Sequence, residues 1–211
     1  MLKLPTQADC CEVVILADGD FPTGNVAAAL LRHATRVVCC DGAAVRFTEQ
    51  GGAPQAIVGD GDSLPAELRA RYADCIVHVA EQESNDLTKA VRYCMTQNWH
   101  HIVILGATGR REDHTLGNIS LLLNYMEMGV EVRMVTDYGA FDPIVGTTQV
   151  ESHLGQQISL FADCRTTVSG DGLKYTLPTH LSGWWSGTLN ESLANRFTIY
   201  VSEPALLYRL F

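Results

Sequence analysis

Ile57-Val58-Gly59-Asp60-Gly61-Asp62-Ser63 is the stretch of this chain that says most about its fold. It places two carboxylates, one residue apart and flanked by glycines, directly after a short apolar run. The apolar run predicts a buried strand, and glycine lets the backbone turn sharply where the strand ends. Oxygen donors on such a turn suit magnesium, which proteins usually bind together with substrate phosphates. Taken alone, the same pattern also fits a tight acidic turn whose Asp side chains bond their own backbone.

The pattern of a short apolar run, a loop and then a helical segment occurs repeatedly on both sides of this stretch. Strands are expected at residues 12–17, 36–40, 56–58, 75–79, 101–105 and 130–136. Helices are expected between them, at about 26–32 and 43–50, from 65, from 85, and at 113–128. Parallel neighbouring strands need long crossover connections, and these connections cover the sheet. We therefore expect an α/β domain: an open parallel sheet with helices on both faces.

The pattern changes after Asp142-Pro143. Short, partly alternating segments follow, separated by Gly, Ser, Asp and Pro, at residues 157–162, 166–169, 172–177, 187–190, 196–201 and 205–210. This texture predicts a small antiparallel β-sandwich or roll. The expected domains are therefore an α/β domain, residues 1–142, and a β-rich domain, residues 143–211. A domain of about 65 residues is marginal alone, so packing on the first domain or on a second subunit is expected.

The composition fits a soluble globular protein, with 46% hydrophobic and 18% charged residues. A formal net charge of −9 argues against a nucleic-acid partner, which would require clustered Lys and Arg. The sequence has neither an uninterrupted apolar stretch long enough to span a membrane nor an N-terminal signal region, so no membrane association and a cytoplasmic location are expected. The seven cysteines include the adjacent pairs Cys10-Cys11 and Cys39-Cys40, which are poor disulfide partners, so mostly free thiols are expected.

Acidic residues follow the successive strands of the predicted sheet. The carboxyl ends of parallel strands share one edge, where open α/β sheets bind ligands. Carboxylates that converge there raise one another's pKa unless a cation is present, so a metal site is expected. The candidates are Asp41, Asp60, Asp62, Asp86 and Asp113. Asp18 and Asp20, after the first strand, are interpreted as loop acids, and taken singly Asp86 and Asp113 also fit ordinary helix-start acids.

The complementary half of the site is expected at Gly106-Ala107-Thr108-Gly109-Arg110-Arg111. A glycine-containing turn that enters a helix presents free N–H groups to an anion, and guanidinium groups match phosphate oxygens. The sequence contains neither the P-loop pattern nor the dinucleotide-binding glycine pattern. An anion site that follows neither of these two patterns is therefore expected.

Motifs along the whole chain resemble those of the thiamine pyrophosphokinase family. In the first domain they are Asp41-Gly42-Ala43, Gly59-Asp60-x-Asp62-Ser63, Glu81-Gln82-x-x-Asn85-Asp86-x-x-Lys89-Ala90 and Gly106-x-x-Gly109-x-Arg111-x-Asp113-His114-x-x-x-Asn118. In the second they are Gly172-Leu173-Lys174-Tyr175-x-Leu177, Asn190-Glu191 and Pro204-x-Leu206-Leu207-Tyr208. The chain departs from the family pattern at three positions, where Arg110 stands for a glycine, Asn85 for a threonine and Leu189 for a serine.

The resemblance implies an ATP-dependent diphosphotransferase that converts thiamine to thiamine pyrophosphate with release of AMP. It also implies a homodimer, with thiamine held where the subunits meet. The catalytic acids would be Asp41, Asp60, Asp62, Asp86 and Asp113, with magnesium on Asp60, Asp62 and Asp86. ATP phosphates would contact Asp41, Gly42, Gly109, Arg110, Arg111 and Asp113. Thiamine would contact Thr188, Asn190 and Tyr208, with Tyr208 stacking on it.

Two other functions remain open at this point. A pyrophosphokinase for another heteroaromatic alcohol, such as a hydroxymethylpterin, would use the same acids with a different second domain. A nucleotide- or thiamine-binding regulator would lack turnover and would be expected to lack one of the acids, but none is missing. The choice between Asp41 and Asp86 as general base is also open, as is the role of Trp184-Trp185, which fits a dimer contact, an acceptor pocket or core.

Overall fold

The computed structural model describes residues 1–211 and divides into two compact units. The α/β unit consists of Thr6–Asp137, and the β unit consists of Met1–Pro5 together with Tyr138–Phe211. The sequence pattern placed the domain boundary after residue 142, but the units divide between Asp137 and Tyr138. The boundary lies earlier because one strand runs through Asp142 and Pro143 without interruption.

The α/β unit is built on six strands in the order β6-β5-β1-β2-β3-β4, and every neighbouring pair is parallel. The strands are β1 (Val13–Leu16), β2 (Arg36–Cys40), β3 (Ala56–Gly59), β4 (Ile76–His78), β5 (His101–Leu105) and β6 (Glu131–Val135). The central strands β1 and β3 are buried along their whole length, as expected for a sheet covered on both faces. The parallel sheet predicted from the sequence is confirmed.

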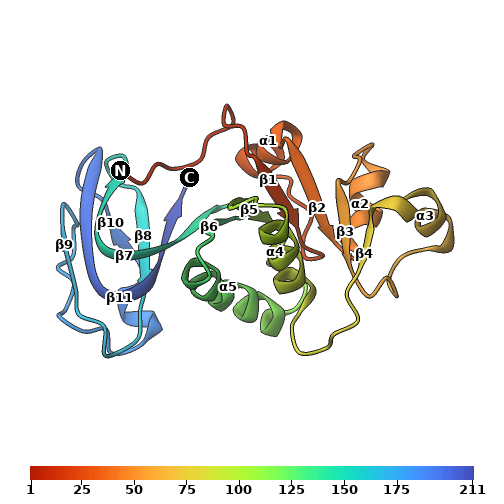
Figure 1. The fold of residues 1–211 in the computed structure, drawn as a ribbon. Helices are drawn as coiled ribbons and strands as arrows, with labels where there is room; N and C mark the ends of the chain where they lie inside the picture. The colour runs from red at the N-terminus through yellow and green to blue at the C-terminus, as the bar shows by residue number, and fades with distance from the viewer. The chain divides into compact units, whose positions relative to one another are not determined.

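Five α-helices connect these strands. They are α1 (Asn25–His33), α2 (Ala43–Glu49), α3 (Ala66–Arg71), α4 (Asp86–Thr96) and α5 (Glu112–Glu127), with a short 3-10 helix η1 (Ala73–Cys75) after α3. The chain moves outward from β1 to β4 and then returns through α4 to β5, on the other side of β1. Because such crossovers are right-handed, the reversal places α4 and α5 on the opposite face from α1, as Figure 1 shows. Strand order therefore switches between β1 and β5.

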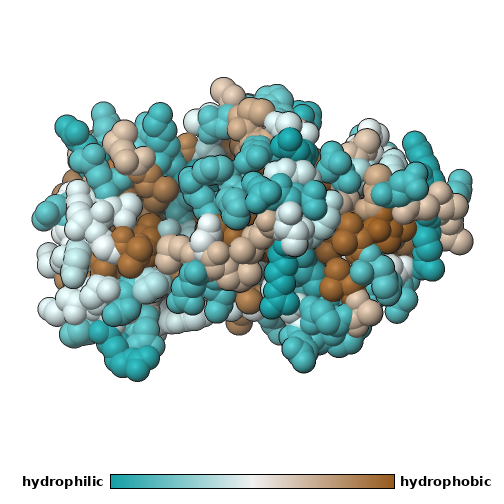
Figure 2. All heavy atoms as spheres, in the orientation of Figure 1, coloured by the Kyte–Doolittle hydropathy of each residue, from teal (hydrophilic) through white to brown (hydrophobic).

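The edge strand β4 is short and incompletely covered. Its Ile76 and Val77 are half-buried, and Figure 2 shows hydrophobic residues at the surface beside it. A three-residue edge offers little backbone for pairing with another chain.

The β unit is organised around two long antiparallel strands, β7 (Gly139–Glu151) and β11 (Arg196–Leu210). The first half of β11 also pairs with β9 (Val168–Asp171), and its second half pairs with β8 (Gln157–Phe161), which pairs in turn with β10 (Asn190–Glu191). The change of partner coincides with an irregularity between Val201 and Ala205. The buried core includes Ile144, Val150, Ile158, Leu160, Phe197, Ile199 and Leu207. The predicted antiparallel β-rich domain is confirmed.

Four segments of the β unit differ from the expectation. Residues 187–190 do not form one strand, because a 3-10 helix ends at Gly187 and β10 begins only at Asn190. Residues 196–210 form one strand instead of two, because the bulge interrupts the pairing without ending the strand. Residues 139–151 form β7 where no strand was expected. Pro143 argues against a strand in the sequence, but β7 accommodates this proline within its pairing with β11. Residues 172–177 form no strand and make only an isolated bridge, between Leu173 and Ser192.

A buried arginine, Arg209, connects the N-terminal residues of the β unit with its long strands. The side chain of Arg209 is fully buried, and its Nη2 donates to Asp142 Oδ2 at 2.8 Å and to the Lys3 carbonyl at 3.0 Å. Its Nη1 donates to the Glu151 carbonyl at 2.9 Å. A buried guanidinium is tolerated only when it is paired and hydrogen-bonded. Asp142 therefore supplies the counter-charge for the centre of this unit.

Removal of the Asp142 carboxylate should destabilise the protein strongly. Asp142→Ala leaves the Arg209 guanidinium buried without this carboxylate, and breaking a buried pair in this way costs about 3–5 kcal/mol. Replacing both partners, as in Asp142→Leu with Arg209→Met, should recover most of that loss because no buried charge remains. Urea unfolding followed by tryptophan fluorescence measures both effects. A loss below about 1 kcal/mol in the single variant would contradict this assignment.

Candidate active site

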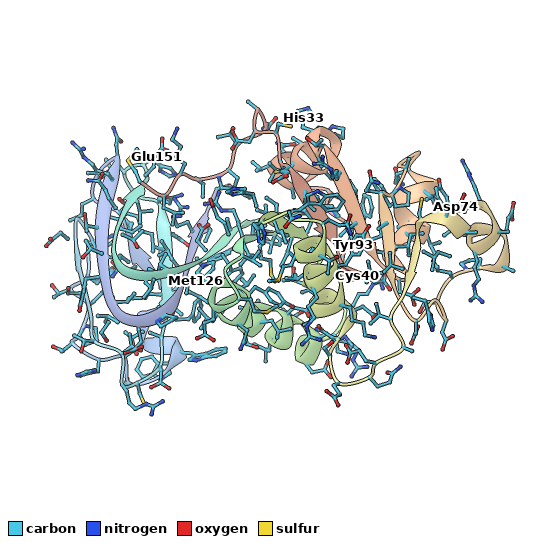
Figure 3. All side chains as sticks on the ribbon, in the orientation of Figure 1. His33, Cys40, Asp74, Tyr93, Met126 and Glu151 are labelled. Carbon is cyan, nitrogen blue, oxygen red and sulfur yellow. The ribbon has the colours of Figure 1, made fainter.

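A cleft of about 450 Å³ opens at the carboxyl ends of the parallel strands in the α/β unit. Its walls come from the loops that follow β1, β2, β3, β4 and β5 and from the N-terminal parts of α4 and α5. In Figure 3, Cys40 marks the cleft end of β2, and His33, just before β2, marks the opposite end. The polar and charged lining residues are Asp18, Asp41, Asp60, Ser63, Gln82, Ser84, Asn85, Asp86, Lys89, Arg110, Arg111, His114 and Asn118.

The structure brings most of the residues predicted for ATP and metal binding to this cleft. The predicted residues that line it are Asp41, Gly42, Asp60, Asp86, Gly109, Arg110 and Arg111. Asp62 and Asp113 are exposed and lie beside the cleft rather than in its lining. The Asp62 N–H donates to Asp60 Oδ1 at 3.1 Å, and the Asp113 carboxylate pairs with Arg111 at 2.5 Å.

Asp41 is a deeply buried acid in the cleft, with 4% of its surface exposed. Gly59 of β3 makes this position possible, because a Cβ there would lie 2.8 Å from the Asp41 Cβ. The Ser63 N–H donates to Asp41 Oδ2 at 3.2 Å, whereas Oδ1 is buried without a hydrogen-bond partner. Burial, followed by repulsion from Asp60 and Asp86, raises the pKa of the Asp41 carboxyl. An unpartnered buried oxygen of this kind indicates a missing cation or proton donor.

Asp86 begins α4 beside a buried lysine. Lys89 Nζ lies 3.1 Å from Asp86 Oδ1, and 3% of the Lys89 side chain is exposed against 38% for Asp86. Asn85 caps the helix, since its Oδ1 accepts from the Thr88 N–H at 3.0 Å and from the Thr88 hydroxyl at 2.8 Å. The Asp86 carboxylate therefore lies between the helix N-terminus and Lys89, both of which carry positive charge. Lys89 also places a positive charge in the cleft wall.

Two asparagines connect α4 with the loop after β5. Asn85 Nδ2 donates to Asn118 Oδ1 at 3.0 Å, and Asn118 Nδ2 donates to the Ala107 carbonyl at 2.9 Å. On the buried side, the Thr88 hydroxyl and the Tyr125 hydroxyl lie 2.8 Å apart in a hydrogen bond. These bonds hold the first turn of α4 at a set spacing from the glycine loop. Asn85, a departure from the family threonine, supplies an amide donor that a threonine lacks.

The loop after β5 has the backbone expected of an anion-binding turn. Gly106 and Gly109 have φ of 64° and 79°, and Arg110 has φ of 59°. Arg111 is the N-cap of α5, so the free N–H groups of the first helical turn follow directly. The side-chain hydrogen bond between Arg111 and Asp113 raises the pKa of Arg111 and lowers that of Asp113.

Several lining residues were not predicted from the sequence. Asp18 lines the cleft although it was interpreted as a loop acid, whereas its neighbour Asp20 does not line it. Lys89 belongs to one of the family motifs but was assigned no role, because a lysine inside a helix is usually solvent-exposed. Its spacing of three residues from Asp86 places both side chains on one helix face and was the available signal. Ser63 lies near Asp41 through the turn that follows β3.

The β unit carries the residues predicted to bind thiamine. Tyr208 of β11 packs on Phe141 of β7 with ring centroids 4.4 Å apart, and Phe161 of β8 lies 6.3 Å from Phe141. Trp184, in the 3-10 helix η2 (Trp184–Gly187), lies 6.1 Å from Phe161 in an edge-on arrangement. These four side chains, here called the aromatic row, are half-buried or exposed.

Thr188 and Asn190 make hydrogen bonds to the backbone of their own unit. Asn190 Oδ1 accepts from the N–H groups of Tyr175 and Glu191, and its Nδ2 donates to the Tyr175 carbonyl at 2.8 Å. The Thr188 hydroxyl donates to the Trp185 carbonyl at 2.7 Å. Both side chains therefore hold the segment around them, and direct contact with thiamine stays a prediction.

Both units match models of one enzyme family. Residues 27–134 match "Thiamin pyrophosphokinase, catalytic domain", and residues 139–208 match "Thiamin pyrophosphokinase, substrate-binding domain". The chain belongs to the thiamin pyrophosphokinase family. It is 28% identical to Thiamin pyrophosphokinase 1 of Caenorhabditis elegans over 185 residues, which cover 80% of this chain and 75% of that protein.

Two bacterial family members extend the comparison. The chain is 31% identical to thiamine pyrophosphokinase of Bacillus subtilis over 99 residues, which cover 45% of this chain and 46% of that protein. The crystal structure of thiamin pyrophosphokinase from Geobacillus thermodenitrificans superposes with a TM-score of 0.75 at 25% identity, covering 94% of this chain and 96% of that chain. The family predicted from the motifs is confirmed.

Substitution of Asp41 should stabilise the ligand-free protein at neutral pH. Because the folded state raises the pKa of this acid, the free energy of unfolding falls as the pH rises from the ordinary Asp value through the raised one. Asp41→Asn removes this loss, and its amide can still accept from the Ser63 N–H. Thermal unfolding in EDTA should give similar melting temperatures at pH 4 and a higher one for the variant at pH 7. A lower melting temperature for Asp41→Asn at pH 7 would contradict a raised pKa for Asp41.

Proposed function

We propose that the chain transfers the pyrophosphoryl group of ATP to the hydroxyl of thiamine, forming thiamine pyrophosphate and AMP. The observation that carries this proposal is the cleft at the strand-order switch, where Asp41, Asp60 and Asp86 face a glycine loop that bears Arg110 and Arg111. Family membership and the match of the second unit to a substrate-binding domain support thiamine over the pterin alternative. The complete set of acids argues against a regulator without turnover.

Asp60 and Asp86 are the proposed magnesium ligands. No three His, Cys, Asp or Glu side chains are grouped closely enough to hold a metal by themselves. Magnesium, however, usually takes one or two carboxylates and completes its octahedron with substrate phosphates and water. The raised pKa of Asp41 supports a cation at this place, because burial and then repulsion from Asp60 and Asp86 disfavour the charge of that carboxyl. Bound there, magnesium would neutralise charge that develops on the phosphates.

Asp62 is proposed to join this site when the nucleotide binds. Gly61, between the two acids, has φ of 79°, and a Cβ at this position would meet no atom within 4 Å. The Asp62 side chain is exposed, so its carboxylate can turn toward the phosphates of a nucleotide in the cleft. Asp113 is proposed to act through Arg111, whose guanidinium it orients by a bidentate pair.

The transfer itself is proposed to use Asp41 as general base. The hydroxyl oxygen of thiamine bonds to the β-phosphorus, its proton passes to the unpartnered Oδ1 of Asp41, and the bond from the β-phosphorus to the bridging oxygen of AMP breaks. Asp86 is less suited to accept the proton because Lys89 pairs with it at 3.1 Å. Arg110, Arg111 and Lys89 hold the phosphates in line, so positioning and electrostatics supply most of the catalysis.

Thiamine recognition is assigned to the aromatic row of the β unit. The thiazolium of thiamine is cationic, so stacking on Tyr208 adds a cation–π contribution of roughly 0.5–2 kcal/mol. Thr188 and Asn190 support this surface by fixing the segment that follows Trp184-Trp185. A homodimer is part of the proposal, since Trp185 and Leu189 expose 75% and 76% of their surface and a second copy would cover apolar surface of this kind.

A cytoplasmic location remains part of the proposal. All seven cysteines are free thiols, which is usual in a reducing compartment. No helix of the structure combines the length and the apolar character that a membrane crossing requires.

The activity is tested by AMP release from MgATP with and without thiamine, together with the mass of the product. Asp60→Asn and Asp62→Asn should each lower kcat/KM for MgATP by about 100-fold or more, because each weakens charge stabilisation of the phosphates. Asp74→Asn is the matched control, an exposed acid at the outer edge of the same unit (Figure 3), and should retain full activity. Thiamine-independent AMP release by the wild type, or full turnover by Asp60→Asn, would refute the proposal.

Removal of the Tyr208 ring should affect thiamine far more than ATP. Tyr208→Ala should raise the KM for thiamine about 3- to 30-fold and leave the KM for MgATP within about twofold, as expected for loss of one stacking contact. Tyr200→Ala is the control, because Tyr200 is an exposed tyrosine on the same strand outside the aromatic row. Equal changes in both KM values would show that Tyr208 acts through the fold and not through stacking.

A further inference from the structure

The loops after β1 and β5 continue the pairing of these strands beyond their ends. The Gly19 N–H donates to the Gly106 carbonyl at 2.7 Å, and the Asp20 N–H donates to the Thr108 carbonyl at 2.9 Å. A Cβ on Gly19 would overlap both of these carbonyl oxygens, so the approach depends on glycine. The two loops thus form one rigid rim where the strand order switches.

Arg110 closes this rim in an unusual backbone conformation. Its φ of 59° lies in the left-handed region, which a residue with a side chain seldom occupies. Its Nη1 donates to the Asp18 carbonyl at 2.6 Å and lies 3.0 Å from Asp18 Oδ2. Because one nitrogen makes both contacts, Nη2 and Nε remain available to a ligand, and both residues line the cleft.

The position of Asp18 is itself constrained. A Cβ on Gly42, at the start of the loop after β2, would lie 2.9 Å from Asp18 Oδ2. The carboxylate therefore packs against residue 42, where glycine leaves room for it. Gly42 lies on one side of the Asp18 carboxylate and the Arg110 guanidinium on the other.

We propose that Asp18 is a positioning residue that acts through Arg110. It holds the guanidinium by Nη1 so that Nη2 and Nε face a phosphate of the bound nucleotide; this inference rests on the function proposed above. Arg110 stands where the family motif has glycine, so the contact belongs to this chain. Asp18 is thereby separated from the acids assigned to magnesium.

The contact between Asp18 and Arg110 orients the guanidinium more than it stabilises the folded protein. The Arg110 and Asp18 side chains are 37% and 44% exposed, and ion pairs as exposed as this one contribute little to folding. A guanidinium that is already oriented, by contrast, loses less freedom when it binds a phosphate. The expected consequence of losing Asp18 is therefore weaker nucleotide binding in a protein that still folds.

The first test compares Asp18→Asn with Asp20→Asn, its matched control in the same loop. Calorimetric titration with MgATP, in the absence of thiamine, should show a Kd about tenfold higher for Asp18→Asn and unchanged for Asp20→Asn, as expected for loss of one charged hydrogen bond. The KM for MgATP should rise in parallel, while the KM for thiamine and the melting temperature stay close to those of the wild type. A Kd for Asp18→Asn within twofold of the wild type would overturn the proposal.

The second test places Asp18→Asn in an Arg110→Gly background. Glycine accepts the positive φ of residue 110, so the loop keeps its path when the guanidinium is removed. Arg110→Gly alone should weaken MgATP binding about tenfold, and adding Asp18→Asn should change it no further. An additive effect that diminishes at high magnesium would show that Asp18 is a metal ligand and would overturn the proposal. A wild-type chain that binds MgATP but forms no AMP would count against the proposed activity alone.

Discussion

The reversal of strand order between β1 and β5 is the constraint on which the α/β unit depends. Right-handed crossovers carry the chain outward from β1 to β4 and return it through α4 to the opposite face. At the point of reversal no helix covers the carboxyl ends of the strands, and the loops that leave them diverge. The cleft lies at this place, and its acids, its glycine loop and its lysine come from four different loops and from the first turn of α4. Each enters the site because its strand ends at this edge.

The charges in the cleft are better compensated when a ligand is bound than in the ligand-free protein. Asp41 is buried with one oxygen unpartnered, and its pKa is raised by burial and by two neighbouring acids. The cations nearby are engaged with other acids, since Lys89 pairs with Asp86 and Arg111 with Asp113. The ligand-free site thus holds an acid that would be better satisfied by a cation or a hydroxyl. Sites arranged in this way sacrifice some stability for binding and chemistry.

The sequence predicted the α/β unit well because each local signal agreed with the tertiary structure. Continuous apolar runs such as residues 13–16 are buried on both faces, and a run of that kind has few alternatives to a central parallel strand. The β unit was harder because Pro143 lies inside β7, where a local rule argues against a strand and only the pairing with β11 overrides it. The residues of the candidate site were also predicted unevenly. Most of the acids near the strand ends were assigned to the site, whereas the role of Asp18 depends on its contact with Arg110, which is distant in sequence, and that of Lys89 depends on helix phase.

The hydrogen bonds of the β unit bear on how an acceptor is chosen. The Asn190 amide donates to the Tyr175 carbonyl, and the Thr188 hydroxyl donates to the Trp185 carbonyl. Both side chains therefore already make hydrogen bonds within their own unit. If recognition rests on the aromatic row instead, selectivity comes from ring shape and charge. A cationic thiazolium gains from the faces of these rings, while a neutral pterin of similar size gains only stacking. The charge of the acceptor, more than its hydrogen-bonding pattern, would then separate thiamine from other heteroaromatic alcohols.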